Sequence, residues 1–453
     1  MRMNNLFRRQ RALVLAVGTA LAACAALPAR ALDLAQVYRL ALEQDSTIRA
    51  ARAAADAGRE RLPQARAQLL PTISANASRS KNDLETTTPD FLGRPATSND
   101  KYTSSNESLT LRQPIFRKLL TAQYRQAKAL VEGAEATLER ELQNLVIRVT
   151  QAYFETLQAD EQLLLIGVQK TAYTTQVDAA RKGFAAGSGT RTDIDEAQAR
   201  LDLILAQELE ARQNVDLARR QIQVLINQPV DKVAPIDVRK LELAPPTPAS
   251  IEEWTLQAEA FSPEIRSLRA QIEAARYEVE KAKAGHYPTL DAIAQISRSN
   301  SENVTRVNSQ YHQKQIGLQL AVPIFQGGYV NSQVREALAQ QERADNALEA
   351  GRRDLGVRVH REFRGVTEGV LRVRALEQAV RSTEQLAVSS RRSFEAGART
   401  RLDILNAEQQ AGTARRDLAQ ARFAYLVARV RLKALAGSLM PENIDEINGW
   451  LQR

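Results

Sequence analysis

The chain has 453 residues, of which 44% are hydrophobic and 25% charged but only 5% aromatic, as is typical of long helices rather than of several compact cores. One cysteine and three histidines exclude a disulfide framework and structural zinc. The net charge is +9, but the first 31 residues hold five arginines and no acid, so the remainder carries only +4 and does not indicate binding to nucleic acid.

The first 31 residues have the pattern of an export signal. Arginines at positions 8, 9 and 11 precede an apolar segment, 12–27, which is too short to span a bilayer comfortably. Ala29-Arg30-Ala31 supplies a small–x–small cleavage pattern, so we expect cleavage after Ala31 and a mature chain that begins at Leu32. A second interpretation stays open, because residues 21–24 resemble a lipobox that would make Cys24 a lipidated first residue.

The mature chain contains an internal duplication. Segment 47–73 matches 264–290, segment 109–116 matches 318–325, and segment 184–194 matches 394–404. Three matches in the same order indicate one repeated unit with different loop lengths. We therefore divide the chain into a signal peptide, a first repeat, a Pro-rich linker, a second repeat and a short C-terminal segment, at 1–31, 32–243, 244–250, 251–436 and 437–453.

Each repeat contains two segments in which apolar residues alternate with polar ones, as in the strands of a membrane barrel. They lie at about 71–80 and 108–114 in the first repeat and at about 288–298 and 315–323 in the second. The polar segments between them, 81–107 and 299–314, are predicted to be loops on the outside of the cell. Four edge strands of a small soluble sheet are the alternative.

The strand count predicts an oligomer. No stretch of 18 apolar residues follows residue 31, so the mature chain is expected either to be soluble in the periplasm or to cross the outer membrane as strands. Four strands cannot close a barrel, since the smallest membrane barrels have about 8. Two chains would supply 8 strands and three chains 12. A pore favours the trimer.

Each repeat also has a long stretch without proline, after Pro114 and after Pro323. Because proline interrupts helix interiors, these stretches favour helices over about 119–185 and 327–395, each roughly 100 Å long. Gly187 and Gly397 are each followed by a Thr and an Asp, which indicates a helix end, a turn and a new helix start. Each repeat is thus predicted to form a long hairpin with its tip at this glycine. Apolar residues recur with coiled-coil spacing at Ile404, Ala407, Ala411, Ala414, Leu418, Ala421, Tyr425, Ala428, Leu432 and Leu435.

The sequence offers no arrangement of residues for catalysis. His286, His312 and His360 are far apart and lack the spacing of metal ligands. Ser188 lies between two glycines, but no strand precedes it and no His/Asp pair accompanies it. We therefore predict a mainly α protein with a membrane β-barrel, without enzymatic activity, cofactor or metal. A soluble periplasmic coiled-coil scaffold or adaptor is the alternative function.

Three segments resemble the TolC family of outer-membrane exit ducts: 285–291 (GHYPTLD), 322–334 (VPIFQGGYVNSQV) and 395–407 (EAGARTRLDILNA). The resemblance covers essentially the whole mature chain, including its duplication. It implies a homotrimer with a 12-stranded barrel among the lipids of a Gram-negative outer membrane, continuous with a helical tunnel in the periplasm. It also implies docking to a periplasmic adaptor (a membrane fusion protein) and to an inner-membrane efflux pump or ABC transporter. The family serves multidrug efflux and type I protein secretion.

The resemblance also nominates a gate at the periplasmic tip. In the family, acidic residues surround the narrowest point. Asp403 falls on the first acidic position, whereas the second is occupied by Asn406, which carries no charge. Arg399 matches the family's tip arginine, and the residues that match its partners in the neighbouring hairpin are Thr192 and Asp193.

The hairpin tips are the surface on which the adaptor is expected to dock, through the loops that contain Gly187, Thr190, Gly397 and Thr400. Plain helix capping, by Thr192 and Asp193 in the first tip and by Thr400 and Asp403 in the second, is the alternative explanation of their pattern. The two roles are compatible for Asp403.

Overall fold

The structure is a computed structural model that describes residues 31–237, 239–301 and 309–451. The export signal before Ala31, and Cys24 with it, lie outside the described residues. The described chain forms two compact units. The first comprises its parts within Met1–Ala50, Glu141–Ser262 and Leu355–Arg453, and the second comprises Ala51–Arg140 and Pro263–Asp354. Each unit therefore combines parts of both predicted repeats.

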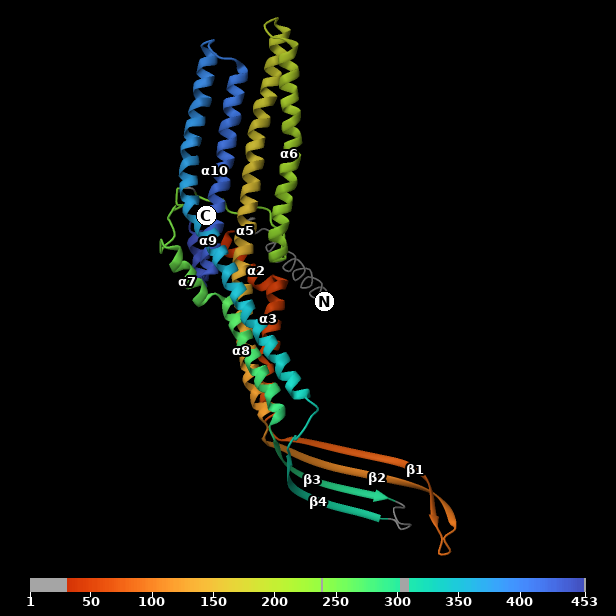
Figure 1. Ribbon diagram of the computed structural model, residues 1–453. Coiled ribbons are helices and arrows are strands. Elements are labelled where there is room, and N and C mark those ends of the chain that lie inside the picture. Colours follow the sequence, from red (N-terminus) through yellow and green to blue (C-terminus); the bar gives the residue numbers. More distant parts are fainter. Residues whose placement is uncertain (1–30, 238, 302–308, 452–453) are drawn as a thin grey trace, which may run out of the picture. The chain divides into compact units, whose positions relative to one another are not determined.

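Two helical hairpins dominate the first unit (Figure 1). One consists of the C-terminal part of α5 (Lys118–Ala185) and α6 (Arg191–Ile226), and the other of the C-terminal part of α9 (Tyr329–Glu395) and α10 (Arg401–Leu435). The predicted helices, 119–185 and 327–395, agree with α5 and α9 to within two residues at each end. Smaller helices complete the unit: α2 (Leu34–Gln44), the start of α3 (Ser46–Arg59), α7 (Ile251–Phe261) and α11 (Pro441–Asn448).

The hairpins are held together by the apolar residues that recur every three or four positions. Along α10, the residues at the predicted coiled-coil positions are buried, apart from three that are half-buried: Ile404, Ala414 and Leu435. Leu405 joins the apolar cluster of the first hairpin, which contains Ile166 and Ile204. The helices thus pack through a narrow apolar seam while their charged side chains face outward.

The segments that begin, connect and end the two repeats meet in the first unit. Leu32 forms a parallel bridge with Val233, where Leu32 N donates to Lys232 O (3.0 Å) and Ala234 N donates to Leu32 O (3.0 Å). Ile236 forms an antiparallel bridge with Leu451, which lies near the C-terminus. The linker is also anchored, because the hydroxyl of Tyr425 in α10 donates to Ala244 O at 2.9 Å.

The second unit consists of closely packed helices and a sheet. Its helices are the rest of α3, α4 (Arg61–Ala67), the first part of α5, α8 (Pro263–Lys283), the short η1 (Ala284–His286) and the first part of α9. Small residues let these helices approach one another. A Cβ atom on Gly58 would lie 2.7 Å from the Cβ of Ala134, and one on Gly351 would lie 2.6 Å from Leu268 Cδ1.

The described strands form one antiparallel sheet in the order β1 (Thr72–Pro89), β2 (Pro95–Phe116), β3 (Thr289–Ser301) and β4 (Ser309–Ala321), as Figure 1 shows. The middle pair, β2 and β3, joins the two repeats. Its register is irregular between Pro114 and Phe116, where proline has no N–H to contribute to the ladder.

The prediction that 81–107 forms a loop was wrong. Strands β1 and β2 continue through this segment, and only residues 90–94 form the turn. Serine, threonine and asparagine side chains pair across the strands here, for example Thr87 with Thr97 (3.0 Å between the hydroxyl oxygens) and Asn82 with Ser104 (2.9 Å). Polarity alone therefore did not mark a loop. In the second segment, 299–314, the strands extend to Ser301 and from Ser309, and residues 302–308 lie outside the described part.

Candidate functional site

The tip of the first hairpin is a tight turn with a cap at each end. Gly187 has φ +73°, a value that side chains disfavour, and its N–H donates to Phe184 O (3.0 Å) while Ser188 N donates to Gly183 O (2.9 Å). Helix α6 then begins at a capping box. Thr190 N donates to Asp193 Oδ2 (2.7 Å), and Asp193 N donates to Thr190 Oγ1 (3.3 Å).

The tip of the second hairpin repeats this geometry. Gly397 has φ +75°, its N–H donates to Phe394 O (2.9 Å), and Ala398 N donates to Ser393 O (2.8 Å). Thr400 N donates to Asp403 Oδ2 (2.9 Å), and Asp403 N donates to Thr400 Oγ1 (3.3 Å). The duplication seen in the sequence is thus also a duplication of backbone geometry, and Asp193 and Asp403 occupy equivalent positions.

The capping residues differ in part from those that the sequence suggested. The residue that caps α6 is Thr190, whereas Thr192 lies inside the first turn of that helix and is exposed. A threonine must immediately precede the helix for its hydroxyl to reach the N–H three residues later, and Thr192 is too far along.

Three of the candidate gate residues, Arg399, Asp403 and Asn406, lie close together in the second hairpin, whereas Thr192 and Asp193 lie in α6 of the first. Hydrogen bonds from the backbone and hydroxyl of Thr400, together with the positive charge of Arg399, hold the pKa of Asp403 below its usual value, so it is ionised at neutral pH. Asn406, one turn further along α10, is exposed. Within this chain, Arg399 Nη1 donates to Ser390 Oγ at 3.2 Å, and Ser390 is buried.

The two faces of the sheet differ in chemistry. Because side chains alternate, the register places Ile73, Leu111, Ala294 and Ile316 in one row on the same face. Neighbouring rows on that face contain Leu109 with Ile296, and Ala292 with Leu318; all of the large side chains among these are exposed. We call this the apolar face. The other face has mainly Ser, Thr, Asn and Gln, and we call it the polar face.

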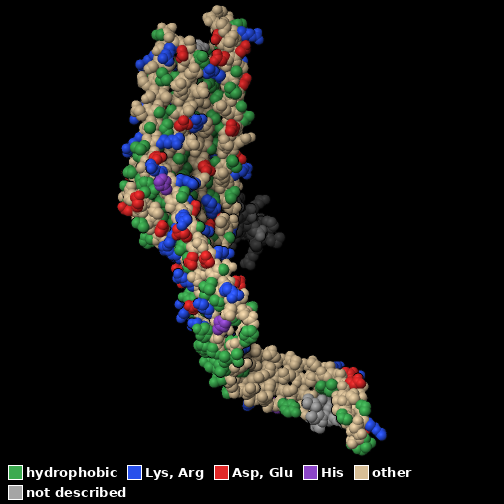
Figure 2. All heavy atoms as spheres, in the orientation of Figure 1, with side chains coloured by type: hydrophobic (Ala, Val, Ile, Leu, Met, Phe, Trp, Pro, Cys, Tyr) green, Lys and Arg blue, Asp and Glu red, His purple; other side chains and the backbone are tan. Residues whose placement is uncertain are grey.

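Figure 2 shows one side of the sheet as largely uncharged, with few hydrophobic side chains. A sheet with one apolar and one polar face suits a wall between lipid and water. None of the helices in residues 31–237, 239–301 and 309–451 has both the length and the apolar character needed to cross a bilayer.

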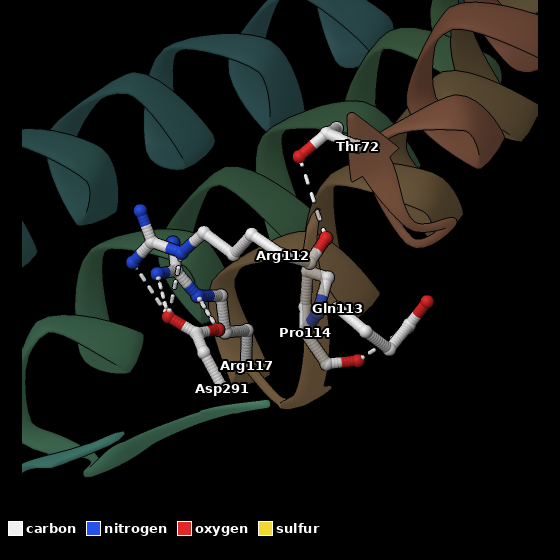
Figure 3. A network of polar contacts seen from close by, with 6 residues as sticks. All are labelled: Thr72, Arg112, Gln113, Pro114, Arg117 and Asp291. Atoms are coloured by element: carbon white, nitrogen blue, oxygen red, sulfur yellow. Dashed lines mark hydrogen bonds and ion pairs between the residues drawn. The ribbon is translucent and has the colours of Figure 1, made fainter. Parts of the chain in front are cut away.

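An ion cluster that the sequence did not suggest lies where the sheet meets the helices (Figure 3). Asp291 of β3 is buried and accepts four hydrogen bonds. Two come from Arg112 of β2, through Nε (3.0 Å) and Nη2 (2.6 Å). The other two come from Arg117, just before α5, through Nε (2.8 Å) and Nη2 (2.5 Å). The only available signal was a single acid among the alternating residues of a predicted strand.

The predicted cleavage site lies beside a structured segment. Ala31 is exposed, and Leu32 is the residue whose backbone bonds to Lys232 and Ala234. Helix α2 begins two residues later, capped by Asp33, whose Oδ1 accepts from Gln36 N at 2.7 Å. Within the described residues, no group of three or more His, Cys, Asp or Glu side chains is arranged to hold a metal ion.

Long helical hairpins together with an amphipathic sheet are typical of outer-membrane channel-tunnels. The family profile described as "Outer membrane efflux protein" matches residues 37–228 and 254–438. The chain therefore belongs to the outer membrane efflux protein family, whose members are channels rather than enzymes, and it is an exit duct of the Gram-negative outer membrane with a large periplasmic part. This result does not favour the soluble scaffold.

Individual relatives agree with this assignment. The chain is 35% identical to the alkaline protease secretion protein AprF of Pseudomonas aeruginosa, over 92% of this chain and 86% of that one. It is 30% identical to the proteases secretion protein PrtF of Dickeya chrysanthemi (94% and 92%), and 28% identical to the outer membrane protein TolC of Escherichia coli (93% and 85%).

Solved structures share the fold. The outer membrane protein VceC of Vibrio cholerae superposes with a TM-score of 0.75 at 18% identity, over 89% of this chain and 96% of that one. CusC, which is described as forming a transmembrane channel, also gives 0.75, at 17% identity and over 90% and 92%.

Proposed function

We propose that three copies of this chain close a 12-stranded barrel that continues into a periplasmic helical tunnel. The observation that carries the proposal is the open sheet. In the described sheet, β1 and β4 each have one edge without a neighbouring strand. In lipid, an unpaired strand edge would leave backbone N–H and C=O groups without partners, at a cost of several kcal/mol for each group. Further copies of the chain satisfy these edges.

A trimer fits better than a dimer. Four strands from each of two chains give 8, and a barrel of about 8 strands has an interior filled by side chains. Three chains give 12 strands and leave a lumen lined by the polar face. The mass of the detergent-solubilised protein, measured by native mass spectrometry, tests this. A trimer is expected, and a monomer or a dimer would contradict the proposal.

The channel moves its cargo passively and takes energy from partners. The helical tips, with Gly187, Thr190, Gly397 and Thr400, dock a periplasmic adaptor, which connects the duct to an inner-membrane efflux pump or ABC transporter. Two relatives, at 35% and 30% identity, are named for the secretion of proteases. Type I secretion of a protein is therefore our first candidate, and multidrug efflux, supported by the family's description, is the second.

Deleting the gene tests the choice of cargo. We expect the loss of a secreted protein from the culture medium, restored by the plasmid-borne wild-type gene. Unchanged secretion together with increased sensitivity to small toxic compounds would assign the duct to efflux instead. Cysteines placed at Ser188 and Ala398 should cross-link to the adaptor, whereas one at the exposed Asn99 in β2 should not.

At the periplasmic tip, three copies of Asp403 form an anionic ring around the channel axis. Close carboxylates attract cations, so trivalent cations should block the channel from the periplasmic side. Asp193 makes the same capping box in the other tip, but its charge is partly neutralised if it is the partner of Arg399. In single-channel recordings, Asp403→Ala should nearly abolish the block, and Asp193→Ala should retain most of it. Asn406→Asp should strengthen the block by doubling the formal charge of the ring. Equal loss in both alanine variants would reduce Asp403 to a helix cap.

Arg399 is proposed to latch the closed tip by bonding Thr192 and Asp193 of the neighbouring hairpin in the assembled trimer. Arg399→Ser should then increase conductance, because a charge-assisted hydrogen bond is lost in each subunit. Ser390→Ala tests the bond that Arg399 makes within its own hairpin. If Ser390→Ala opens the channel as much as Arg399→Ser does, the latch is internal to one hairpin and the proposal is wrong.

The mature chain is proposed to begin at Leu32 without lipid, followed by the two repeats, 32–243 and 251–436, that the linker 244–250 separates. The intact mass of the purified protein decides this, since a diacylated or triacylated Cys24 would add the mass of its acyl chains. The turn at residues 90–94 is proposed to face the outside of the cell. An epitope inserted beside Gly93 should bind antibody on intact cells, and labelling only after permeabilisation would reverse the topology.

A further inference from the structure

The apolar face changes abruptly in chemistry toward the β1–β2 turn. Beyond the row that contains Ile73, each of the next four rows on the same face contains a basic side chain, beginning with Lys314 in the row of Leu109 and Ile296. The register places Lys314 opposite Ile296, and His312 opposite Arg298. On the other edge of the sheet, Arg79 and Lys81 continue the face that begins with Ile73. We call Arg79, Lys81, Arg298 and Lys314 the basic rim.

The basic rim has an excess of positive charge. All four side chains are exposed, and the acid among them is Glu107, which lies opposite Arg298. Four cations and one carboxylate leave +3 per chain over these four rows. Asp83, further along β1, already has a cation of its own, since Lys101 Nζ lies 3.4 Å from its Oδ2.

The charge is confined to one side of the sheet. At the same levels, the register gives the polar face serine, asparagine, glutamine and tyrosine: Asn76, Ser78, Ser80, Ser104, Asn106, Ser108, Ser297, Ser299, Ser301, Ser309, Tyr311 and Gln313. None of these is charged at neutral pH. A basic constriction for cargo would require cations on the polar face. The basic rim therefore faces the surroundings of the apolar face and not the proposed lumen.

We propose that the basic rim binds the phosphate groups of the phosphorylated glycolipid that forms the outer leaflet of the outer membrane. This inference rests on the proposed barrel and its topology. In that arrangement, the apolar rows contact acyl chains, and the next rows toward the outside lie at the level of the phosphorylated headgroups. Arginine holds phosphate through paired N–H donors, and lysine reaches it as a flexible point charge.

The spacing of the rim suits several phosphates on one lipid layer. Lys314 and Arg298 are diagonal neighbours on adjacent strands, about 7–8 Å apart at their Cα atoms. Arg79 and Lys81 are two residues apart on one strand, about 7 Å. Each pair can therefore contact separate phosphate groups of the surrounding lipid, while the alkyl stems rest on the apolar rows.

The test compares phosphate-bearing and phosphate-free lipid on the full-length protein in detergent. Bisphosphorylated lipid A, enzymatically dephosphorylated lipid A and inorganic phosphate are the probes, and native mass spectrometry counts bound molecules. We expect lipid A to bind at least ten-fold more tightly than its dephosphorylated form, and inorganic phosphate not to compete at equal concentration. Arg79→Gln/Arg298→Gln/Lys314→Gln should remove that preference.

A matched control removes the same number of charges from the helices. Arg353→Gln/Arg364→Gln/Arg416→Gln changes three exposed arginines that make local ion pairs, and should leave the preference for lipid A intact. Equal binding of the two lipids by the wild type, competition by inorganic phosphate, or equal loss in both triple variants would overturn the inference. The wild-type comparison stands even if the rim variant fails to fold.

The same preparations separate this inference from the proposed function. A conducting trimer that ignores the phosphates of lipid A would overturn the basic rim alone. A protein that forms no trimer would overturn both.

Discussion

Replacing Asp291 by asparagine tests how strongly the ion cluster fixes the sheet to the helices. The carboxylate side chain is 3% exposed, and its arginine partners Arg112 and Arg117 are 46% and 26% exposed. Asparagine keeps the shape and one acceptor oxygen but loses the charge. Four arginine N–H groups then face a neutral amide, whose single oxygen can accept at most two hydrogen bonds.

The magnitude follows from the exposure of the arginines. Hydrogen bonds to a charged group contribute about 1.5–3 kcal/mol each, and breaking a fully buried ion pair costs about 3–5 kcal/mol. Both arginines keep contact with water, which reduces these values substantially. We expect Asp291→Asn to lower the free energy of local opening by about 2 kcal/mol, which is roughly a 30-fold increase in the opening constant. Arg117→Gln should cost more than Arg112→Gln, because Arg117 is the less exposed partner.

Hydrogen exchange measured by mass spectrometry reads this effect locally. Amides at the start of β3 should exchange roughly 30-fold faster in Asp291→Asn, as the 2 kcal/mol estimate requires. Asp83→Asn is the control, because Asp83 pairs with Lys101 in the same sheet at 66% and 79% exposure. Its effect should stay below about 0.5 kcal/mol. If both variants change exchange less than two-fold, burial of the carboxylate does not anchor β3, and the reasoning is refuted.

Three further predictions concern caps, a turn and pH. Thr400→Ala and Thr190→Ala should each lower the free energy of local opening in the first turn of the capped helix by about 1 kcal/mol, which speeds hydrogen exchange there. Unchanged exchange in both variants would show that the capping boxes do not stabilise the tips. Gly187→Ala should destabilise the tip by about 1–2 kcal/mol because of its positive φ, whereas Gly167→Ala, inside α5 with open space around it, should stabilise by about 0.5–1 kcal/mol; the same sign for both in thermal unfolding would contradict this. Burial disfavours the charge of Asp45, but hydrogen bonds from Ile48 N and Arg148 outweigh it and keep its pKa below the usual value. The stability that Asp45 contributes is therefore present above its unfolded pKa of about 3.9 and is lost as the pH falls through its lower folded pKa. The free energy of unfolding measured with urea should therefore fall more steeply with acid in the wild type than in Asp45→Asn.

The helices were predictable from the sequence because their determinants are local. The absence of proline, the regular apolar spacing and a glycine followed by threonine predict α5, α9 and both tips to within a few residues of their observed positions. The apolar parts of the strands were predictable for the same reason. The polar extension of β1 and β2 was not, since the partner of a serine or threonine in a ladder lies elsewhere in the chain.

The ion cluster could not be predicted because it depends on which strands are neighbours. Arg117 and Asp291 are 174 residues apart, and they meet only because β2 of one repeat pairs with β3 of the other. Periodicity within a strand indicates its faces but not its neighbour. The prediction of the N-cap of α6 was wrong for a more local reason. Thr190 and Thr192 are both plausible N-cap residues until the backbone of the turn is known.

The matching tips have a consequence for symmetry. In the proposed trimer, six hairpins surround one axis. Because each chain encodes two different hairpins, one substitution changes only three of the six, and these three alternate around the axis. Asp193 and Asp403 are equivalent, but one turn later the first repeat has Glu196, paired with Arg200, and the second has Asn406. A ring of six identical chains would have to accept every substitution six times. Fusing two copies into one gene lets a substitution affect three of the six positions, so that electrical character at the entrance evolves separately from the shape that seals it.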